Sequence, residues 1–276
     1  MKIVFFNHYH NGDIFASKGY IKDLVKELSS HELYYQHYHS PKLLRDINIQ
    51  HQTLEVPLGN FSDRNPMAGD KDSIFINTWI GNYLSGDNGI NWNTYHTMFS
   101  KIYSALADMM DRSIEVGPVE YYFPEINYEY FDIPDIKIPK GSIIISNGPV
   151  LSGQSTLPDL NNIISGLLEK TDRNIILTHF APFNSDRIYY TNNMIETTGG
   201  DLNEISWVAS QCDYLIGRNS GPFCFMNTKN ILNDSSKNII SIGNNEKDSF
   251  IYNVPIKSNY NFIHDQDVLN VLDIVK

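Results

Sequence analysis

Residues 201–228, DLNEISWVASQCDYLIGRNSGPFCFMNT, decide how the chain folds. Their first eleven residues place apolar side chains at helical spacing, which predicts an amphipathic helix with an acidic first turn. Residues 214–217, YLIG, have the length of a buried strand. A polar turn at residues 218–222, RNSGP, then leads into another helix. In an α/β sheet such a turn lies where ligands bind, although its Asn and Ser can equally be plain helix caps.

Composition limits the classes of protein. The chain has 276 residues, 41% hydrophobic, and a formal net charge of −11. This charge, with no Lys/Arg cluster, argues against a nucleic-acid partner. Only two cysteines occur, Cys212 and Cys224, which is too few for a disulfide framework. The N-terminal MKIVFF is too short for a signal peptide and no run reaches the ~18 apolar residues of a membrane span, so we expect a cytoplasmic protein.

The N-terminus predicts the start of a Rossmann-like domain. Lys2–Phe6 has four consecutive apolar residues and reads as a buried strand. A polar loop, NHYHNGD, covers residues 7–13, and residues 14–28 have the pattern of a helix with one apolar face. No G-x-G-x-x-G is present, so the segment is not a dinucleotide fingerprint.

Strands and helices alternate along the rest of the chain, which predicts α/β architecture with parallel sheets. The expected strands are residues 33–39, 73–79, 142–146, 174–179, 214–217 and 238–242, and the expected later helices are 95–112, 159–168, 201–211 and 265–275. A proline-containing charged segment, residues 133–140, suits a linker. Because the pattern restarts at 141, we expect two Rossmann-like domains, 1–132 and 141–276, facing a central cleft. The C-terminal helix could belong to the second domain or could pack back on the first domain.

Two short motifs resemble GT-B glycosyltransferases, most closely the heptosyltransferase family. Residues 201–228 resemble the donor-site segment of that family, with the turn Asn219-Ser220-Gly221 between strand and helix. Gly12-Asp13, after the first strand, resembles the family's opening Gly-Asp pair. The resemblance implies a metal-independent, inverting transferase of hexosyl or heptosyl groups that needs no cofactor. It implies a nucleotide-sugar donor and a glycan or glycolipid acceptor in polysaccharide biosynthesis, and it leaves room for peripheral association with a membrane.

The resemblance also implies roles for individual residues. Asp13 would be the general base that takes the proton of the attacking hydroxyl, although an Asp at a helix start is also a common cap. Arg218 would stabilise the leaving diphosphate. The expected donor-binding residues are Asn147, Gly148, Ser152, Gln154, His179, Phe180, Glu204, Asn219, Ser220 and Gly221. The expected acceptor-side residues are His8, His10, Asn11 and Gly12.

Other functions stay open at the level of sequence. The H-x-H of His8 and His10 invites a metal-dependent hydrolase, with His179 as a third ligand. The same spacing recurs at residues 37–39, which favours a plain polar loop and no metal. A sugar epimerase on the same architecture is a further possibility. A non-catalytic nucleotide- or glycan-binding protein is also possible, because Gln154 stands in the loop where the family commonly carries Lys or Arg.

Overall fold

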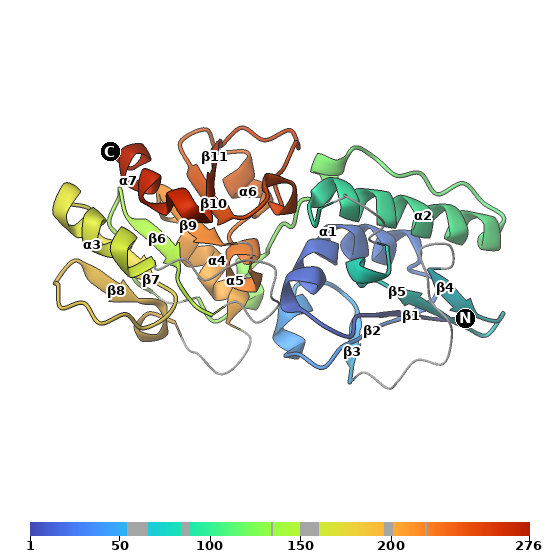
Figure 1. Cartoon of the computed structure of the whole chain (residues 1–276). Coiled ribbons are helices and arrows are strands. Elements are labelled where there is room, and N and C mark those ends of the chain that lie inside the picture. The colour runs from blue at the N-terminus through green and yellow to red at the C-terminus, as the bar shows by residue number, and fades with distance from the viewer. Residues whose placement is uncertain (54–65, 84–88, 134, 150–159, 196–200, 219) are drawn as a thin grey trace.

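The computed structural model describes residues 1–53, 66–83, 89–133, 135–149, 160–195, 201–218 and 220–276. They form two α/β lobes placed side by side (Figure 1). The first lobe runs from β1 to η4 and the second from β6 to α7. The predicted architecture of two α/β units with mainly parallel sheets is therefore confirmed.

The sheet of the first lobe has the strand order β3-β2-β1-β5-β4. All its pairings are parallel except the one between β4 and β5. Its strands are β1 Lys2–Phe6, β2 Glu32–Gln36, β3 Gln50–Gln52, β4 Met67–Gly69 and β5 Ser73–Asn77. Its helices are α1 Asn11–Glu27 and α2 Trp92–Met110, with the 3-10 turns η1 Pro41–Leu44, η2 Ile80–Asn82, η3 Val119–Tyr122 and η4 Tyr128–Tyr130.

The sheet of the second lobe is parallel throughout, in the order β11-β10-β9-β6-β7-β8. Its strands are β6 Ile143–Ser146, β7 Ile175–Leu177, β8 Ile188–Tyr190, β9 Tyr214–Arg218, β10 Asn238–Gly243 and β11 Asn259–His264. Its helices are α3 Leu160–Lys170, α4 Leu202–Ser210, α5 Gly221–Phe225, α6 Lys229–Leu232 and α7 Val271–Ile274, with the 3-10 turns η5 Thr191–Asn193, η6 Glu246–Asp248 and η7 Asp265–Asn270.

The strands that the sequence predicted are the ones covered on both faces. Every residue of β6 and β9 is buried, which requires the continuous apolar run that made them visible. The strands β3, β4, β8 and β11 were missed, because most of their residues are exposed or partly exposed and they lack a continuous buried apolar run. The predicted last helix is instead η7 followed by α7. The α7 helix packs on α3 in the second lobe and does not pack back on the first lobe.

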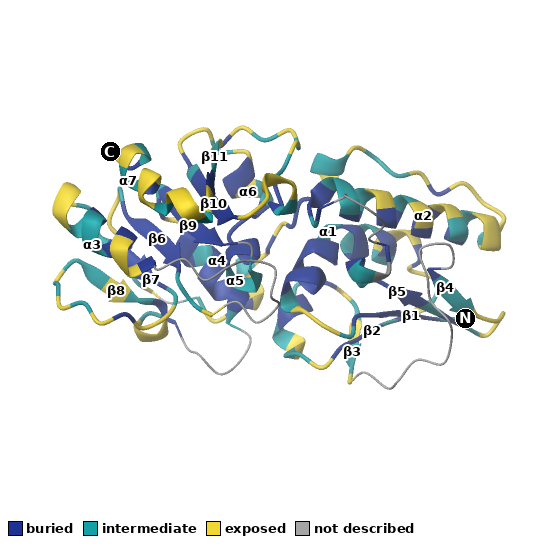
Figure 2. Ribbon diagram, viewed as in Figure 1, coloured by how far each residue is buried: buried dark blue, intermediate teal, exposed yellow. Residues whose placement is uncertain are grey.

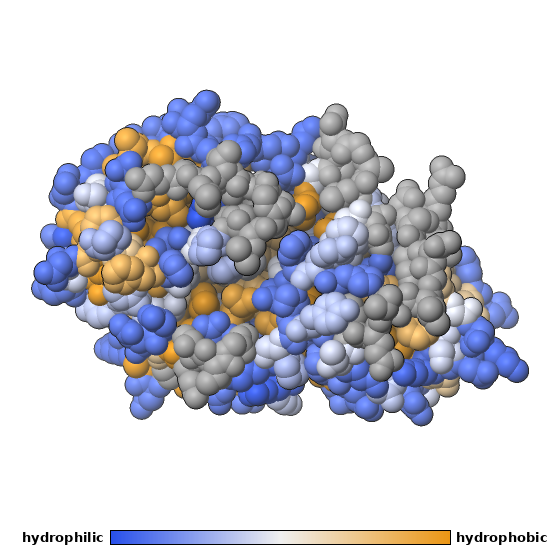
Figure 3. All heavy atoms as spheres, turned by 60° about the horizontal axis from the view of Figure 1, so that its bottom comes forward, coloured by the Kyte–Doolittle hydropathy of each residue, from blue (hydrophilic) through white to orange (hydrophobic). Residues whose placement is uncertain are grey.

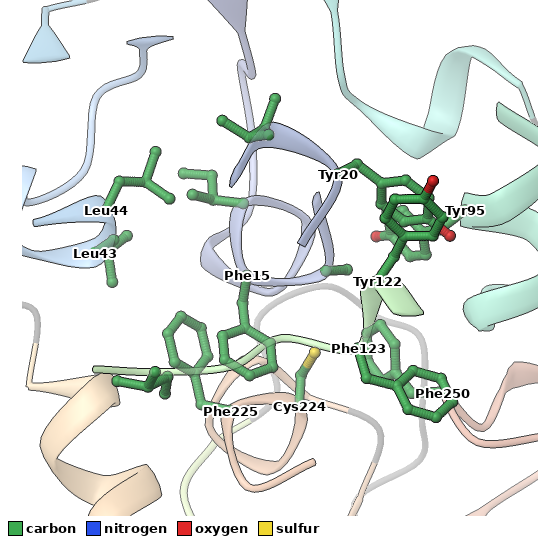
Figure 4. Packing of buried hydrophobic residues seen from close by; sticks show 14 of the residues in the cluster. Phe15, Tyr20, Leu43, Leu44, Tyr95, Tyr122, Phe123, Cys224, Phe225 and Phe250 are labelled. Carbon is green, nitrogen blue, oxygen red and sulfur yellow. The ribbon is translucent and has the colours of Figure 1, made fainter. Parts of the chain in front are cut away.

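The two lobes share one hydrophobic cluster, which is centred on α1 and α5. The Phe15 and Phe225 rings lie 4.2 Å apart between their centroids, and Cys224 lies beside them (Figure 4). Figure 2 shows that both helices are buried where the lobes meet. At this point the lobes are in packed contact. On the face shown in Figure 3, hydrophilic residues predominate among the coloured atoms and apolar residues form separate patches.

Candidate functional site

Two strand-to-helix turns meet at the contact between the lobes. We call residues 7–13, which follow β1 and include the first three residues of α1, the first turn. We call residues 218–221, from the last residue of β9 to the first residue of α5, the second turn. A Cβ atom built on Gly12 would lie 3.6 Å from Cα of Gly221, and one built on Gly221 would lie 3.9 Å from the Gly12 nitrogen. The two glycines therefore face each other closely, and a Cβ atom at either one would make an ordinary van der Waals contact with the other turn.

Asp13 lies in the first turn of α1 and is almost fully buried, with 6% of its surface exposed. The Tyr95 hydroxyl of α2 donates a hydrogen bond to its Oδ1. Burial raises the pKa of Asp13 to about 6, against the lowering effects of the bonds to Tyr95 and to the His10 backbone. His10 is the N-cap residue of α1 and makes no side-chain cap. Asp13 is therefore not the N-cap of α1, and the capping alternative is not observed. It presents a buried carboxyl group at the interlobe contact.

The partners of Asp13 could not be found from the sequence. Tyr95 is 82 positions away and its helix was predicted only from its apolar pattern. Cys224 lies three residues after Gly221, on α5. Its Sγ lies 3.8 Å from the Gly12 carbonyl oxygen, and burial raises the pKa of the thiol well above its ordinary value. Cys224 is therefore a packing residue between the turns in its thiol form.

Arg218 ends β9 and is 4% exposed. Its Nη2 donates a hydrogen bond of 2.6 Å to the carbonyl oxygen of Gly148, which follows the neighbouring strand β6. Burial lowers the pKa of the guanidinium, and the charge of Asp265 acts in the opposite direction. Arg218 thus ties together the carboxyl ends of adjacent strands and stands within reach of an acidic side chain.

Further expected donor-binding residues gather at the same edge of the second sheet. Asn147 and His179 are joined reciprocally: Asn147 Nδ2 donates to the His179 carbonyl and His179 N–H donates to Asn147 Oδ1, both at 2.8 Å. Phe180 follows with 73% of its surface exposed, and its ring stacks on Tyr190 at 5.8 Å. The described residues that follow β6 therefore contact both the residues that follow β7 and the end of β9.

Ser220 is the N-cap residue of α5 without a side-chain cap, so the simple capping role is not observed for it. Ser152, Gln154 and Asn219 lie outside the described residues. The α5 helix has five residues, so its dipole is small beside that of a longer helix. Any anion at the second turn would depend mainly on side chains and individual backbone amides.

Glu204 lies in the first turn of α4 and is 1% exposed. Within the described part of the chain neither carboxylate oxygen has a hydrogen-bond partner, and burial raises the pKa of this group. Its neighbour Asn203 accepts a hydrogen bond of 3.3 Å from Lys18 of the first lobe. Lys18 in turn forms a buried ion pair of 2.6 Å with Asp46. Glu204 is thus next to the polar contact between Asn203 and Lys18 that joins the two lobes.

The acceptor-side residues lie along the first turn. His8 is half-buried and burial lowers the pKa of its imidazole, whereas His10 is exposed. The structure places His179 in the other lobe, where its backbone is hydrogen-bonded to the Asn147 side chain. In the described residues, no group of three or more His, Cys, Asp or Glu side chains is arranged to hold a metal ion. No described helix has both the length and the apolar character needed to cross a membrane.

Comparisons with known proteins agree on the fold. No protein-family model matches the chain, and no curated protein sequence matches it. The structure of the Escherichia coli heptosyltransferase WaaC with ADP-2-deoxy-2-fluoro heptose superposes with a TM-score of 0.52 at 10% identity, covering 99% of each chain. WaaC with ADP gives a TM-score of 0.50 at 8% identity, covering 100% of both chains. A glycosyl transferase family 9 protein from Veillonella parvula gives 0.47 at 11% identity, covering 99% of this chain and 88% of that chain.

The likeness to WaaC extends over the whole chain and shows that this protein has the GT-B fold. The structural resemblance to heptosyltransferases that the two motifs predicted is therefore confirmed. At this level of sequence identity the likeness establishes the architecture, and the chemistry has to be argued from the residues of this chain.

Proposed function

We propose that the protein is a glycosyltransferase that moves a hexosyl or heptosyl group from a nucleotide-sugar donor to a glycan or glycolipid acceptor. The observation that carries this proposal is the meeting of the two turns. It places a buried carboxylate of the first lobe beside the glycine turn of the second. The GT-B fold of the chain supports the same reading. The buried free thiols of Cys212 and Cys224 fit the cytoplasmic location expected from the sequence.

The proposed reaction is a single displacement with inversion. An acceptor hydroxyl attacks the anomeric carbon, the bond from that carbon to the diphosphate oxygen breaks, and Asp13 takes the hydroxyl proton. With a pKa of about 6 the carboxylate is mostly ionised at neutral pH and still basic enough to act. The departing nucleoside diphosphate would be stabilised by Arg218 and by backbone amides of the loops after β6 and β9. No metal enters this scheme.

The donor would lie along the carboxyl edge of the second sheet. The ends of β6, β7 and β9 carry Arg218, Gly148 and the hydrogen-bonded pair Asn147 and His179. Phe180 offers an exposed ring on which a nucleobase could stack. Glu204, Ser220 and Gly221 complete the proposed donor side, together with Ser152, Gln154 and Asn219 from segments not described. His8, His10, Asn11 and Gly12 are proposed to face the acceptor.

A second candidate is a nucleotide- or glycan-binding protein without catalysis. One observation favours it: Arg218 already donates a hydrogen bond to Gly148 and interacts electrostatically with Asp265. These interactions reduce the positive charge and the number of N–H donors that Arg218 can present to a diphosphate. Binding would then persist while leaving-group stabilisation is weak.

Two measurements separate these functions. A thermal-shift screen against UDP, GDP, ADP and CMP identifies the nucleotide, because a ligand that binds the folded state raises its melting temperature. Transfer is then assayed with sugars of that nucleotide. We expect Asp13→Asn to keep nucleotide binding and to lose about 10²- to 10⁴-fold in transfer rate. Asp108→Asn, at an exposed position of α2, is the matched control and should retain activity. Wild-type binding without any turnover would favour the second candidate, and full activity of Asp13→Asn would remove Asp13 from its role.

A further inference from the structure

Two aromatic rings stand together at the carboxyl end of the first sheet. Tyr9 follows β1 and Trp79 follows β5, and their ring centroids are 4.2 Å apart with 38° between the planes. Tyr9 is 48% exposed and Trp79 is partly exposed, so this contact is at the surface and is not part of the core.

The backbone that carries each ring is fixed by the same kind of hydrogen bond, from a backbone N–H to an asparagine side chain two residues earlier. Asn7 Oδ1 accepts a hydrogen bond from the Tyr9 N–H at 2.9 Å, and Asn77 Oδ1 accepts one from the Trp79 N–H at 2.9 Å. Both asparagines are buried at strand ends that lie next to each other in the parallel register. The pairing of β1 with β5 therefore places the two turns, and with them the two rings, side by side.

Further contacts fix the orientation of each ring. A Cβ atom built on Gly81 would lie 2.2 Å from the Trp79 indole, so the indole lies against a position that only glycine leaves open. A ring nitrogen of His39 makes a hydrogen bond with the Tyr9 carbonyl oxygen. A pre-formed surface of this kind loses little conformational entropy when a ligand stacks on it.

We propose that Tyr9 and Trp79 form a stacking subsite for a pyranose ring of the acceptor glycan. The apolar face of a sugar packs on aromatic rings while its hydroxyls need polar neighbours. His8 and His10 supply such neighbours, since each imidazole lies 5.9 Å from the Tyr9 ring. Identification of this sugar as the acceptor rests on the proposed transferase function.

The position of the subsite agrees with that role. Tyr9 and Asp13 belong to the same turn, and the Asp13 N–H donates to the His10 carbonyl oxygen, so the stacked sugar would lie on the loop that carries the proposed base. A nucleobase could also stack on these rings. However, the residues proposed for the nucleotide lie in the other lobe, at the ends of β6, β7 and β9. The sugar is therefore the occupant that the arrangement favours.

The test uses saturation-transfer NMR on the full chain with methyl glycosides of glucose, galactose, mannose, N-acetylglucosamine and glucuronic acid, and with uridine and adenosine as competitors. We expect at least one glycoside to bind, and its dissociation constant to rise at least 10-fold in Tyr9→Ala and in Trp79→Ala. Tyr130→Ala, at another exposed tyrosine on η4, should leave it unchanged. Thermal melts of the variants show whether they remain folded, and Tyr9→Phe should retain binding.

The inference fails if no glycoside binds the wild type, if the two variants bind like Tyr130→Ala, or if only the nucleosides lose binding in them. Nucleotide binding, measured separately by thermal shift, distinguishes this failure from that of the proposed function. Nucleotide shifts without glycoside binding would remove only the subsite. Glycoside binding that depends on Tyr9 and Trp79, without any nucleotide binding or transfer, would keep the subsite and remove the transferase.

Discussion

The two turns that meet between the lobes have the same topology and opposite chemistry. The first turn leads from β1 into a helix of 17 residues and carries the buried acid Asp13. The second leads from β9 into a helix of 5 residues and carries the buried cation Arg218. Both contain a glycine, and these two glycines lie close together. The first turn therefore contributes a buried acid and the second a buried cation, which under the proposed function would act as the base and as the anion-binding group. Three changes test how far the two turns depend on each other.

The largest expected effect comes from removing the packing between α1 and α5, the helices that follow the two turns. Phe15 of α1 packs on Phe225 of α5, and both are 1% exposed. Phe15→Ala should lower the free energy of unfolding by about 3–5 kcal/mol, because it leaves a cavity in the shared cluster. Urea denaturation measures this change. Met109→Ala, at an exposed position of α2, is the control and should cost under about 0.5 kcal/mol. A small effect of Phe15→Ala would mean that the lobes hold together without this contact.

The next effect concerns the charge of the first turn. The pKa of Asp13 is raised to about 6 from an ordinary value of 3.8. The unfolded chain therefore ionises first as the pH rises. The fold loses about 3 kcal/mol of stability in total as the pH rises from below the unfolded pKa to above the folded pKa. Asp13→Asn should recover much of this at pH 8, since its amide oxygen can still accept from Tyr95. At pH 4 the variant should match the wild type. Equal gains at both pH values would show that ionisation is not the cause.

The smallest of the three effects concerns the cation of the second turn. Arg218→Met removes the guanidinium that is proposed to contact the diphosphate, together with its hydrogen bond to Gly148. We expect nucleotide affinity to fall about 10- to 100-fold, corresponding to the ~1.5–3 kcal/mol of one charged hydrogen bond to the diphosphate. Arg173 offers a matched control, because its Nη1 donates to the Gly141 carbonyl at 2.8 Å before β6 begins. Arg173→Met should leave nucleotide affinity unchanged. If both variants lose affinity equally, Arg218 acts only through the stability of the lobe.

Some of this site was visible in the sequence and some was not. Asp13 and Gly221 could be singled out because each follows a strongly apolar strand and precedes a helical pattern. The Tyr95 contact and the Cys224 contact with Gly12 join residues far apart in the chain. No local pattern predicts such pairs. Trp79 was expected at the cleft end of its strand, but its contact with Tyr9 was not predicted, because an aromatic residue in a loop looks the same whether it faces solvent or the core.

Local periodicity alone determined the alternation of strands and helices and the division into two α/β units, because burial of a strand or of one helix face demands apolar residues at fixed spacing. The packing of the lobes decided the rest. It brought Gly12 against Gly221, buried Asp13 enough to raise its pKa, and set Tyr9 beside Trp79. These properties arise from contacts between distant segments and from the exclusion of water, and both exist only once the chain has folded.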